Sequence, residues 1–372
     1  MTPPRPLARR LAPAVAFLLG VGGLSPAQAP ATAPSATSLT TRLSSPQCTL
    51  DEATAILGQL RDRTVPVRQS LFDALCKAFE NQTEGCAQQR ERLLQRFAKA
   101  VPATQRTLLG RGGEARVDAL RKQARAITAR PELTKEMIHA ELDPLLAELR
   151  TMLLPTPPKV FEHDATLADE AEALRRQQRE LDRWFDLCLE AAHALDGDAD
   201  GRKHVARHGL PPLPATTDDL DAALLDACLF ALPLGAGDRR ALEFNETLRP
   251  RTDPREFAGT LELNRIRLAL GLGALRIDEK LGNAARDHSQ DMFTLGFFAH
   301  ESPVEGKRSF GDRASRAGTS ASSENIAQGQ TTGEGAIEGW WYSPGHHKNM
   351  LGGHARTGLG RFEHTWTQLF GG

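Results

Sequence analysis

The chain has 372 residues, 25% of them charged, and its formal net charge is −1. This length allows two or three domains with cores of their own. A nearly neutral chain lacks the basic surface that nucleic-acid binding requires, so nucleic-acid-binding proteins are set aside.

Residues 1–29 have the pattern of a secretory signal peptide. Arg5, Arg9 and Arg10 precede an apolar run over 11–24, and small residues follow at Ala27-Gln-Ala29. A basic start, a short apolar run and a small-x-small site are the marks of such a peptide. No apolar run in the chain approaches the ~20 residues of a membrane helix. We therefore predict a secreted protein, periplasmic or extracellular, without a transmembrane segment.

Residues 30–46 consist largely of Ala, Thr, Ser and Pro. Such a segment buries too little apolar surface to offset the entropy of ordering, so a disordered linker is predicted there. A mostly helical, bundle-like domain is predicted over 47–250. It starts at the capping box Thr49–Glu52, in which each residue satisfies a backbone N–H of the other.

The clearest helix of this domain is predicted over 167–195. Its apolar residues are seven apart, and Gln178 is a polar exception between them. They are Leu167, Leu174, Leu181, Cys188 and Leu195. This spacing makes a seam that faces neighbouring helices. A bundle core is preferred to an intermolecular coiled coil, because the proline stretches 154–158 and 210–214 interrupt the pattern. The domain resembles no family known to us, and we predict a protein partner for it.

All five cysteines lie in the helical domain: Cys48, Cys76, Cys86, Cys188 and Cys228. Because exported proteins favour disulfides, pairs Cys76–Cys86 and Cys188–Cys228 are predicted, with the fifth thiol free or intermolecular. A nucleophilic cysteine is the alternative, but no histidine accompanies any of them in a pattern typical of catalysis.

The stretch Asp196-Gly-Asp-Ala-Asp-Gly201 is similar to the first half of a calcium loop, but its twelfth position is Arg207 instead of a bidentate Glu. A solvated turn at a helix end is the preferred interpretation. His204 and His208 are one helical turn apart and could hold a metal, yet the sequence offers them no third ligand.

A new domain is predicted over 251–372. Asp253-Pro-Arg-Glu256 is a strong helix start. A second helix is expected over 278–295, with His288 and Leu295 on its buried stripe. The elements expected after it are a glycine- and serine-rich link over 311–323, a short strand over 325–328, two short helices, and two final strands over 358–363 and 366–370. Helices on a small antiparallel sheet make this domain, and the chain, α+β.

Between 264 and 370 lies a series of motifs that resembles the bacterial, SCP-like branch of the CAP superfamily, named after cysteine-rich secretory, antigen 5 and pathogenesis-related 1 proteins. Taken together the motifs are specific. They are Asn264-x-x-Arg267, Asp278-x-x-Leu281, His288, His300-x-Ser-Pro303, Arg313, Glu324-Asn325-Ile-Ala327, Trp340, Ser343-Pro-Gly-His346-x-x-Asn349 and Trp366-Thr-Gln368.

The resemblance implies a three-layer α-β-α sandwich with a polar cavity. Animal and plant members carry two His and two Glu there, and the His pair can bind a divalent cation. His300 and Glu324 match the first of each, whereas Ser343 replaces the second Glu and Thr365 stands near the second His. The resemblance therefore implies His346 as the substitute, and a zinc-like cation on His300 and His346. Expected cavity residues are His300, Glu324, Ser343, His346, Asn349, Trp366 and Gln368.

Purely structural roles are the alternatives for these residues. Glu324 could satisfy buried amides, Trp340 and Trp366 are expected to be core or cavity wall, and His347 and His354 are expected to be exposed. We prefer a non-catalytic binding module for a lipid-like, peptide or cell-envelope ligand. The alternative is a hydrolase that uses Ser343, Ser302 or a metal-bound water, although the chain has neither a Ser-His-Asp order nor a His-Glu-x-x-His motif.

Overall fold

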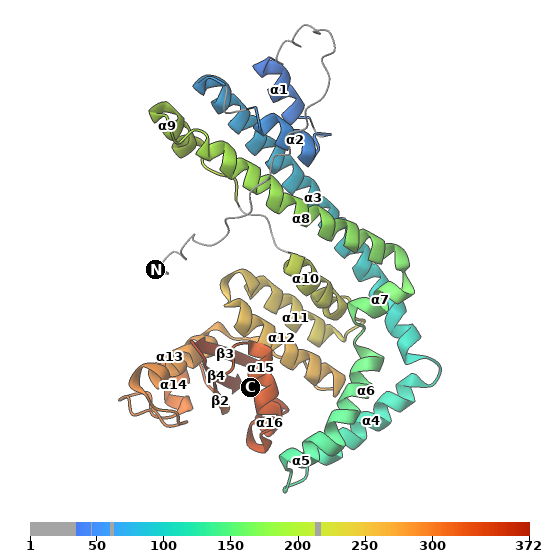
Figure 1. The fold of residues 1–372 in the computed structure, drawn as a ribbon. Coiled ribbons are helices and arrows are strands. Elements are labelled where there is room, and N and C mark those ends of the chain that lie inside the picture. Colours follow the sequence, from blue (N-terminus) through green and yellow to red (C-terminus); the bar gives the residue numbers. More distant parts are fainter. Residues whose placement is uncertain (1–34, 46, 60–62, 213–216) are drawn as a thin grey trace, which may run out of the picture.

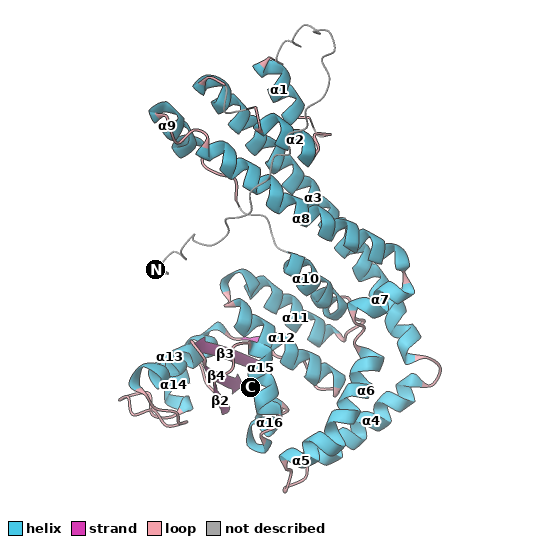
Figure 2. Ribbon diagram, in the orientation of Figure 1, coloured by secondary structure: helices cyan, strands magenta, loops and turns pink. Residues whose placement is uncertain are grey.

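The computed structural model describes residues 35–45, 47–59, 63–212 and 217–372. A long helical arm extends from a lower part that contains the sheet (Figure 1). Helices dominate, and strands occur only near the C-terminus of the described chain (Figure 2). None of the described helices is both long and apolar enough to cross a bilayer. The predicted signal peptide 1–29 lies outside the described residues.

The arm is built on two long helices, α3 (Val65–Leu109) and α8 (Ala165–His193). They run antiparallel: Arg96 pairs with Glu170 near one end, and Arg68 Nη1 donates to Ala194 O over 2.6 Å near the other. The predicted heptad seam of α8 is buried, and Gln178 is only 4% exposed. Because the seam packs on α3 of the same chain, the predicted bundle is confirmed.

The segment 30–46 was predicted to be a disordered linker, and this prediction is wrong over 36–43. Helix α1 (Ala36–Leu43) forms there, with Ser35 as its N-cap. Leu39 and Leu43 lie one turn apart, and both are buried against the arm. Two leucines on one face are enough when a neighbouring helix covers them. Helix α2 (Leu50–Leu57) follows, and Thr49 caps it as predicted. The other half of the predicted capping box is not formed, because the Glu52 side chain pairs with Arg42.

The predicted disulfides are not formed: all five cysteines are free thiols. Cys76 and Cys86 lie on the same helix α3, where ten residues separate them by about 15 Å, too far for a disulfide. Cys188 has Cys76 as its hydrogen-bonding neighbour, and this contact together with burial raises the pKa of the Cys188 thiol.

A helical hairpin connects the two long helices of the arm. It comprises α4 (Gly113–Thr128), α5 (Lys135–Met137), a π-helical turn (Ile138–Leu142), α6 (Asp143–Leu153) and α7 (Pro157–His163). After α8 come α9 (Ala199–His208), α10 (Thr217–Phe230), α11 (Ala236–Leu248) and a 3₁₀ turn (Arg249–Arg251). Asp198 caps α9 by accepting from Asp200 N and Gly201 N, so the acidic stretch forms a helix start.

The C-terminal domain begins with α12 (Pro254–Ala269), which Asp253 caps as predicted. Its further elements are β1 (Arg276–Ile277), α13 (Glu279–Leu295), α14 (Phe310–Arg316), β2 (Ser323–Gln328), α15 (Gly333–Trp341), α16 (Pro344–Met350), β3 (Arg356–Phe362) and β4 (Thr365–Gly371). The strand order is β1-β3-β4-β2, and the β1–β3 pair is parallel, so the sheet is mixed rather than wholly antiparallel.

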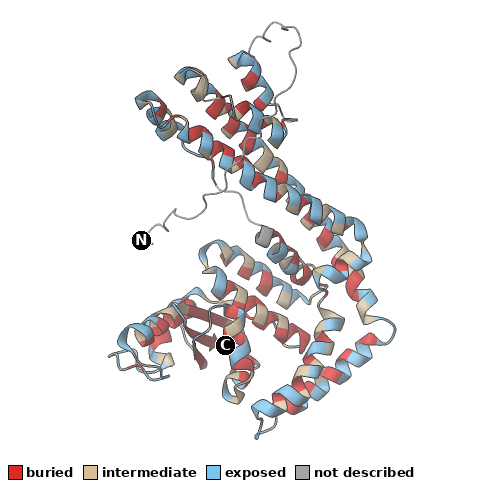
Figure 3. Ribbon diagram, in the orientation of Figure 1, coloured by how far each residue is buried: buried red, intermediate tan, exposed pale blue. Residues whose placement is uncertain are grey.

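Helices cover the sheet on both faces. Leu369 packs with α13 in one apolar cluster, whereas Trp366 and Phe370 pack in another with residues of α12 and α15. Helix α13 lies so close to β3 that a Cβ on Gly358 or Gly360 would come within 2.2 Å of the helix backbone. The α+β fold with its three layers is therefore as expected, with a buried sheet at its centre (Figure 3).

Two local expectations in this domain were wrong. The link over 311–323 contains α14, which starts at a capping box between Ser309 and Asp312. Leu295 was predicted to end the buried stripe of α13, but its side chain is 58% exposed. It is the last residue of the helix, directly before the C-cap Gly296.

The helical region and the C-terminal domain share one core. Leu120 of α4 and Leu142 and Leu149 of the α6 hairpin belong to the same buried cluster as Ile337 and Trp340 of α15. Hydrogen bonds reinforce this contact: Asp143 accepts from the indole Nε1 of Trp341 over 2.8 Å and from the hydroxyl of Tyr342 over 3.1 Å. The two parts are therefore packed together rather than linked by a free tether.

Candidate functional site: a buried carboxylate between a histidine and an arginine

The centre of the site is Glu324, whose side chain is 1% exposed. It lies on β2, the edge strand of the sheet. Its Oε1 contacts the Nδ1 of His300 at 2.9 Å, and its Oε2 accepts from the Nη2 of Arg313 at 2.5 Å. A buried carboxylate is tolerated only with such partners. The structure thus joins His300 and Glu324, which sequence reasoning assigned to one cavity.

Arg313, on α14, has no exposed side-chain surface. Besides Glu324 it donates to the carbonyls of His300 (3.1 Å), Lys307 (2.8 Å) and Arg308 (3.1 Å). One guanidinium therefore fixes both the carboxylate and the loop that carries His300. In the sequence Arg313 stands out only as part of the motif series, although a buried Glu requires a cationic partner nearby.

His346 approaches the site from α16, the layer beyond the sheet edge. Its ring centre is 6.2 Å from that of His300. Burial, and then the neighbouring His300, lower the pKa of His346. A neutral imidazole is consequently favoured at this position, with one ring nitrogen available as acceptor or metal ligand.

Polar side chains hold α16 against β2. Asn349 Nδ2 donates to Glu324 O over 3.0 Å and to Asn325 Oδ1 over 2.9 Å. Asn325 Nδ2 in turn donates to Gln368 Oε1 over 3.3 Å. Asn325 and Gln368 are fully buried. Asn349 and, through Asn325, Gln368 therefore hold the backbone of β2 in place around Glu324.

The two tryptophans of the site belong to the core, as expected. Trp340 and Trp366 are at most 1% exposed. Trp340 Nε1 donates to Ile326 O over 2.9 Å, and Trp366 Nε1 donates to Gln330 O over 2.8 Å. Together with Asn349, Trp340 thus occupies backbone carbonyls of the edge strand β2, which protects that edge against pairing with another strand.

Neither candidate serine has a base. Ser302 Oγ accepts from Val304 N over 3.2 Å within a turn. Ser343 precedes α16 as its N-cap and makes no side-chain capping bond. In the part of the chain that the structure describes, no histidine hydrogen-bonds either hydroxyl, so the arrangement that activates a serine nucleophile is not formed.

Three further histidines of the domain, His288, His347 and His354, differ in how deeply they are buried. His288 is fully buried on α13, as predicted, and contacts Ala299 O through Nε2 at 3.1 Å. His347 was expected to be exposed but is fully buried, because its ring packs on Trp341 and its Nδ1 lies 2.8 Å from Trp341 O. His354 is half-buried and stacks on Phe370, so it too was wrongly expected at the open surface.

His300 and His346, the predicted metal ligands, meet some but not all requirements of a metal site. Two imidazoles lie near each other, and the Nε2 of His300 is not used by Glu324. Glu324, however, is engaged by Arg313 on its second oxygen. Among the described residues these groups do not form a cluster of three ligand atoms. A cation here would need ligands from solvent or from a bound molecule.

The C-terminal part of the chain is similar to known proteins. Residues 261–367 match the family model "CAP: Cysteine-rich secretory protein family". Over 108 residues the chain is 42% identical to "Uncharacterized protein YkwD" of Bacillus subtilis, covering 27% of this chain and 40% of the relative. It is 32% identical over 108 residues to "Uncharacterized membrane protein YlbC" of the same organism, covering 29% of this chain and 31% of the relative.

A crystal structure of an extracellular protein containing a SCP domain from Bacillus anthracis is 28% identical, covering 37% of this chain and 44% of that one, with a TM-score of 0.31. The chain thus spans less than half of the length of each of these relatives. The residues matched by the family model include His300, Arg313, Glu324 and His346. The C-terminal third of this chain is a CAP domain of the cysteine-rich secretory protein family.

Proposed function

We propose that the protein is an exported, non-catalytic binding module whose CAP domain binds a small ligand beside His300 and His346. The observation that carries this proposal is the saturation of Glu324: one of its oxygens contacts His300 and the other accepts from the buried Arg313. Both oxygens of this carboxylate are already engaged by protein groups, so neither is placed to take a proton from a substrate or a water molecule. Export is proposed from the pattern of residues 1–29.

The exposed part of the site has the character of a recognition surface. The side chain of His300 is 51% exposed, whereas that of Glu324 beneath it is 1% exposed. A ligand would therefore contact imidazole edges, while the carboxylate orients His300 from below. A lipid-like, peptide or cell-envelope ligand with a polar head fits this arrangement. Strand addition by a peptide does not, since Asn349 and Trp340 occupy carbonyls of β2.

The proposal includes a divalent cation of the zinc type, which would bridge the two histidines and the bound ligand. His300 and His346 would supply two neutral nitrogen ligands, and the bound molecule would supply the others. We also propose that the helical region binds a protein partner, because it forms a helical bundle.

The proposal is tested by equilibrium binding of fatty acids, lysophospholipid and soluble peptidoglycan fragments to the full chain, each with and without Zn²⁺. We expect saturable binding of one ligand class, at least tenfold weakened in His300→Ala and His346→Ala. Ester and peptide substrates are incubated in parallel. Turnover that disappears in His300→Ala would contradict the binding module and favour the hydrolase.

A further inference from the structure

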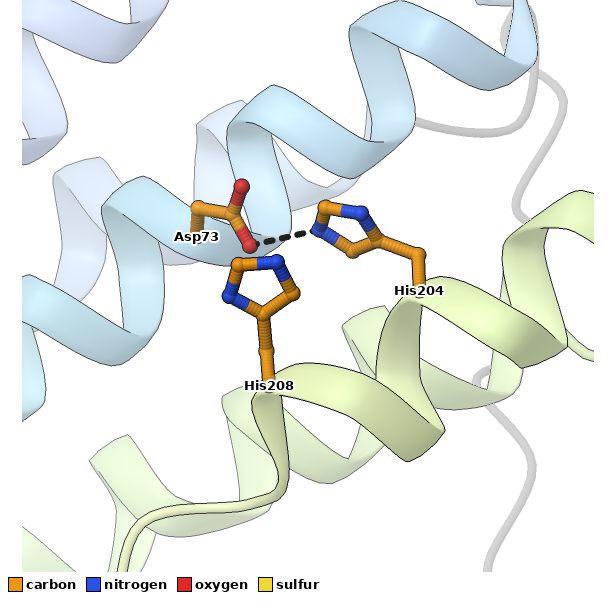
Figure 4. A group of neighbouring side chains, drawn as sticks. All are labelled: Asp73, His204 and His208. Atoms are coloured by element: carbon orange, nitrogen blue, oxygen red, sulfur yellow. Dashed lines mark hydrogen bonds and ion pairs between the residues drawn. The ribbon is translucent and has the colours of Figure 1, made fainter.

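A second group of metal-ligating side chains lies at the far end of the arm, away from the CAP domain. His204 and His208 occupy successive turns of α9, and Asp73 faces them from α3 (Figure 4). The sequence showed only the histidine pair. The fold supplies the third ligand from a position 131 residues earlier than His204.

The geometry of this group is close to that of a metal site. His204 Nε2 is 2.7 Å from Asp73 Oδ1, and the rings of His204 and His208 stack with centres 4.3 Å apart. One ligand atom from each residue lies within 4.8 Å of the other two. Three ligands around a tetrahedral ion are about 3.3 Å apart, given bond lengths of about 2.0–2.1 Å. Small side-chain rotations suffice to reach that spacing.

The surroundings hold His204 in place and leave the site open to solvent. Phe72 meets the ring of His204 edge-on, with centres 6.2 Å apart. The side chain of His204 is 18% exposed and that of Asp73 is 41% exposed, while His208 lies at the surface. An ion can therefore enter from solvent, and a water molecule can complete its coordination.

The start of α9 is fixed independently of any ion. Asp198 caps the helix, and a Cβ on Gly201 would come within 2.4 Å of Leu195 O, so this turn packs tightly against the end of α8. Gln69 Nε2 also donates to Asp200 O over 3.2 Å. The histidine-bearing face of α9 is consequently presented to α3 before any metal binds, which lowers the entropic cost of assembling the site.

We propose that Asp73, His204 and His208 bind a divalent transition metal of the zinc class, with water as the fourth ligand, and that the ion fastens α9 to α3. Two imidazoles and one carboxylate are ligands typical of Zn²⁺, and they suit Co²⁺ and Ni²⁺ as well. Calcium and magnesium are disfavoured, because they require mostly oxygen ligands. This site is independent of the function proposed for the CAP domain.

The test is titration of the tag-free full chain with Co²⁺, followed by displacement with Zn²⁺. The parent carries His300→Ala and His346→Ala, so that the CAP histidines do not contribute. We expect one equivalent to bind with the visible bands of four-coordinate cobalt and without an intense sulfur-to-cobalt band. His208→Ala should weaken binding at least ~100-fold, since losing an outer partner of a ligand alone costs 10–100-fold. Asp73→Asn should weaken it as well.

The matched control is His163→Ala, an exposed histidine at the end of α7, which should bind as the parent does. Far-UV circular dichroism of His208→Ala checks that the exposed position tolerates the change. Zn²⁺ should raise the Tm of the parent and not that of His208→Ala. The proposal is overturned if no ion binds at micromolar concentration, if His208→Ala titrates like the parent, or if a sulfur charge-transfer band places the ion on cysteine.

Discussion

Arg313 and Glu324 form an ion pair in which neither side chain reaches solvent, their exposed fractions being 0% and 1%. This pair connects α14 to the edge strand β2. Through the carbonyl of His300, Arg313 also fixes the loop between α13 and α14. The candidate site is therefore built on a structural ion pair, and its exposed imidazole depends on that pair for orientation.

Replacing Arg313 with Met should destabilise the folded chain by about 3–5 kcal/mol, because the buried carboxylate of Glu324 loses its cationic partner on Oε2. Chemical denaturation followed by tryptophan fluorescence measures the loss. The matched control is Arg308→Met, whose partner is Glu301 in a pair that is 77% and 71% exposed; no measurable loss is expected there. Equal losses of stability in Arg313→Met and Arg308→Met would contradict the importance of the buried ion pair. Adding Glu324→Leu to Arg313→Met should restore much of the stability.

His288 should make stability depend on pH. Burial, reinforced by Arg313, lowers the pKa of His288 to about 4. The unfolded chain binds a proton near the ordinary value of about 6.5, whereas the folded chain does not until about pH 4. His288 therefore contributes stability above pH 6.5 that is lost as pH falls toward 4, by up to roughly 3 kcal/mol.

The measurement is the free energy of unfolding of wild type and His288→Asn between pH 4 and 8. Burial raises the pKa of Glu256 to about 7, so this carboxyl acts with the opposite sign and favours the folded state at low pH. Glu256 is present in both proteins, so the difference between their free energies of unfolding at each pH reports the contribution of His288. A difference that stays constant with pH would show that His288 does not titrate as described.

Tyr342 offers a specific probe of the contact between the two parts of the chain, since it is the sole tyrosine. Burial, the charge of Asp143 and the hydrogen bond from its hydroxyl to Asp143 raise the pKa of Tyr342. In Asp143→Ala the phenol should ionise at a lower pH, which absorbance of the phenolate reports. Asp169→Ala, at an exposed position on α8, is the control and should leave the titration unchanged.

The same Asp143→Ala change should lower stability by about 1.5–3 kcal/mol, because the indole of Trp341 also loses a charged acceptor. An unaltered phenol titration together with unaltered stability would mean that α6 does not bind the CAP domain through Asp143.

Under oxidising conditions the first disulfide should join Cys76 to Cys188, the two thiols that are hydrogen-bonding neighbours. Peptide mapping of the non-reduced, alkylated protein identifies the pair. Cys86→Ser should not change the outcome, whereas Cys76→Ser should abolish it. Detection of a Cys76–Cys86 peptide would be incompatible with both residues lying on one continuous α3.

The sequence by itself determined the elements that depend on neighbouring residues. The seven-residue spacing along 167–195 predicted α8, and Asp253 and Asp278 marked the starts of α12 and α13. Helix periodicity and capping act over three to seven residues, so the chain displays them directly. The motifs from Asn264 to Gln368 likewise indicated the CAP domain, because their order and types are preserved along the chain.

Only the tertiary structure decided which distant side chains meet. It brought Arg313 to Glu324, Asp73 to His204, and Cys76 to Cys188, and it buried Leu39 and His347 beneath other elements. Each of these contacts depends on how helix faces and the sheet edge pack against each other, which is set by the sum of many apolar contacts rather than by any local pattern. The sequence therefore displayed most of these residues, and packing decided which of them meet.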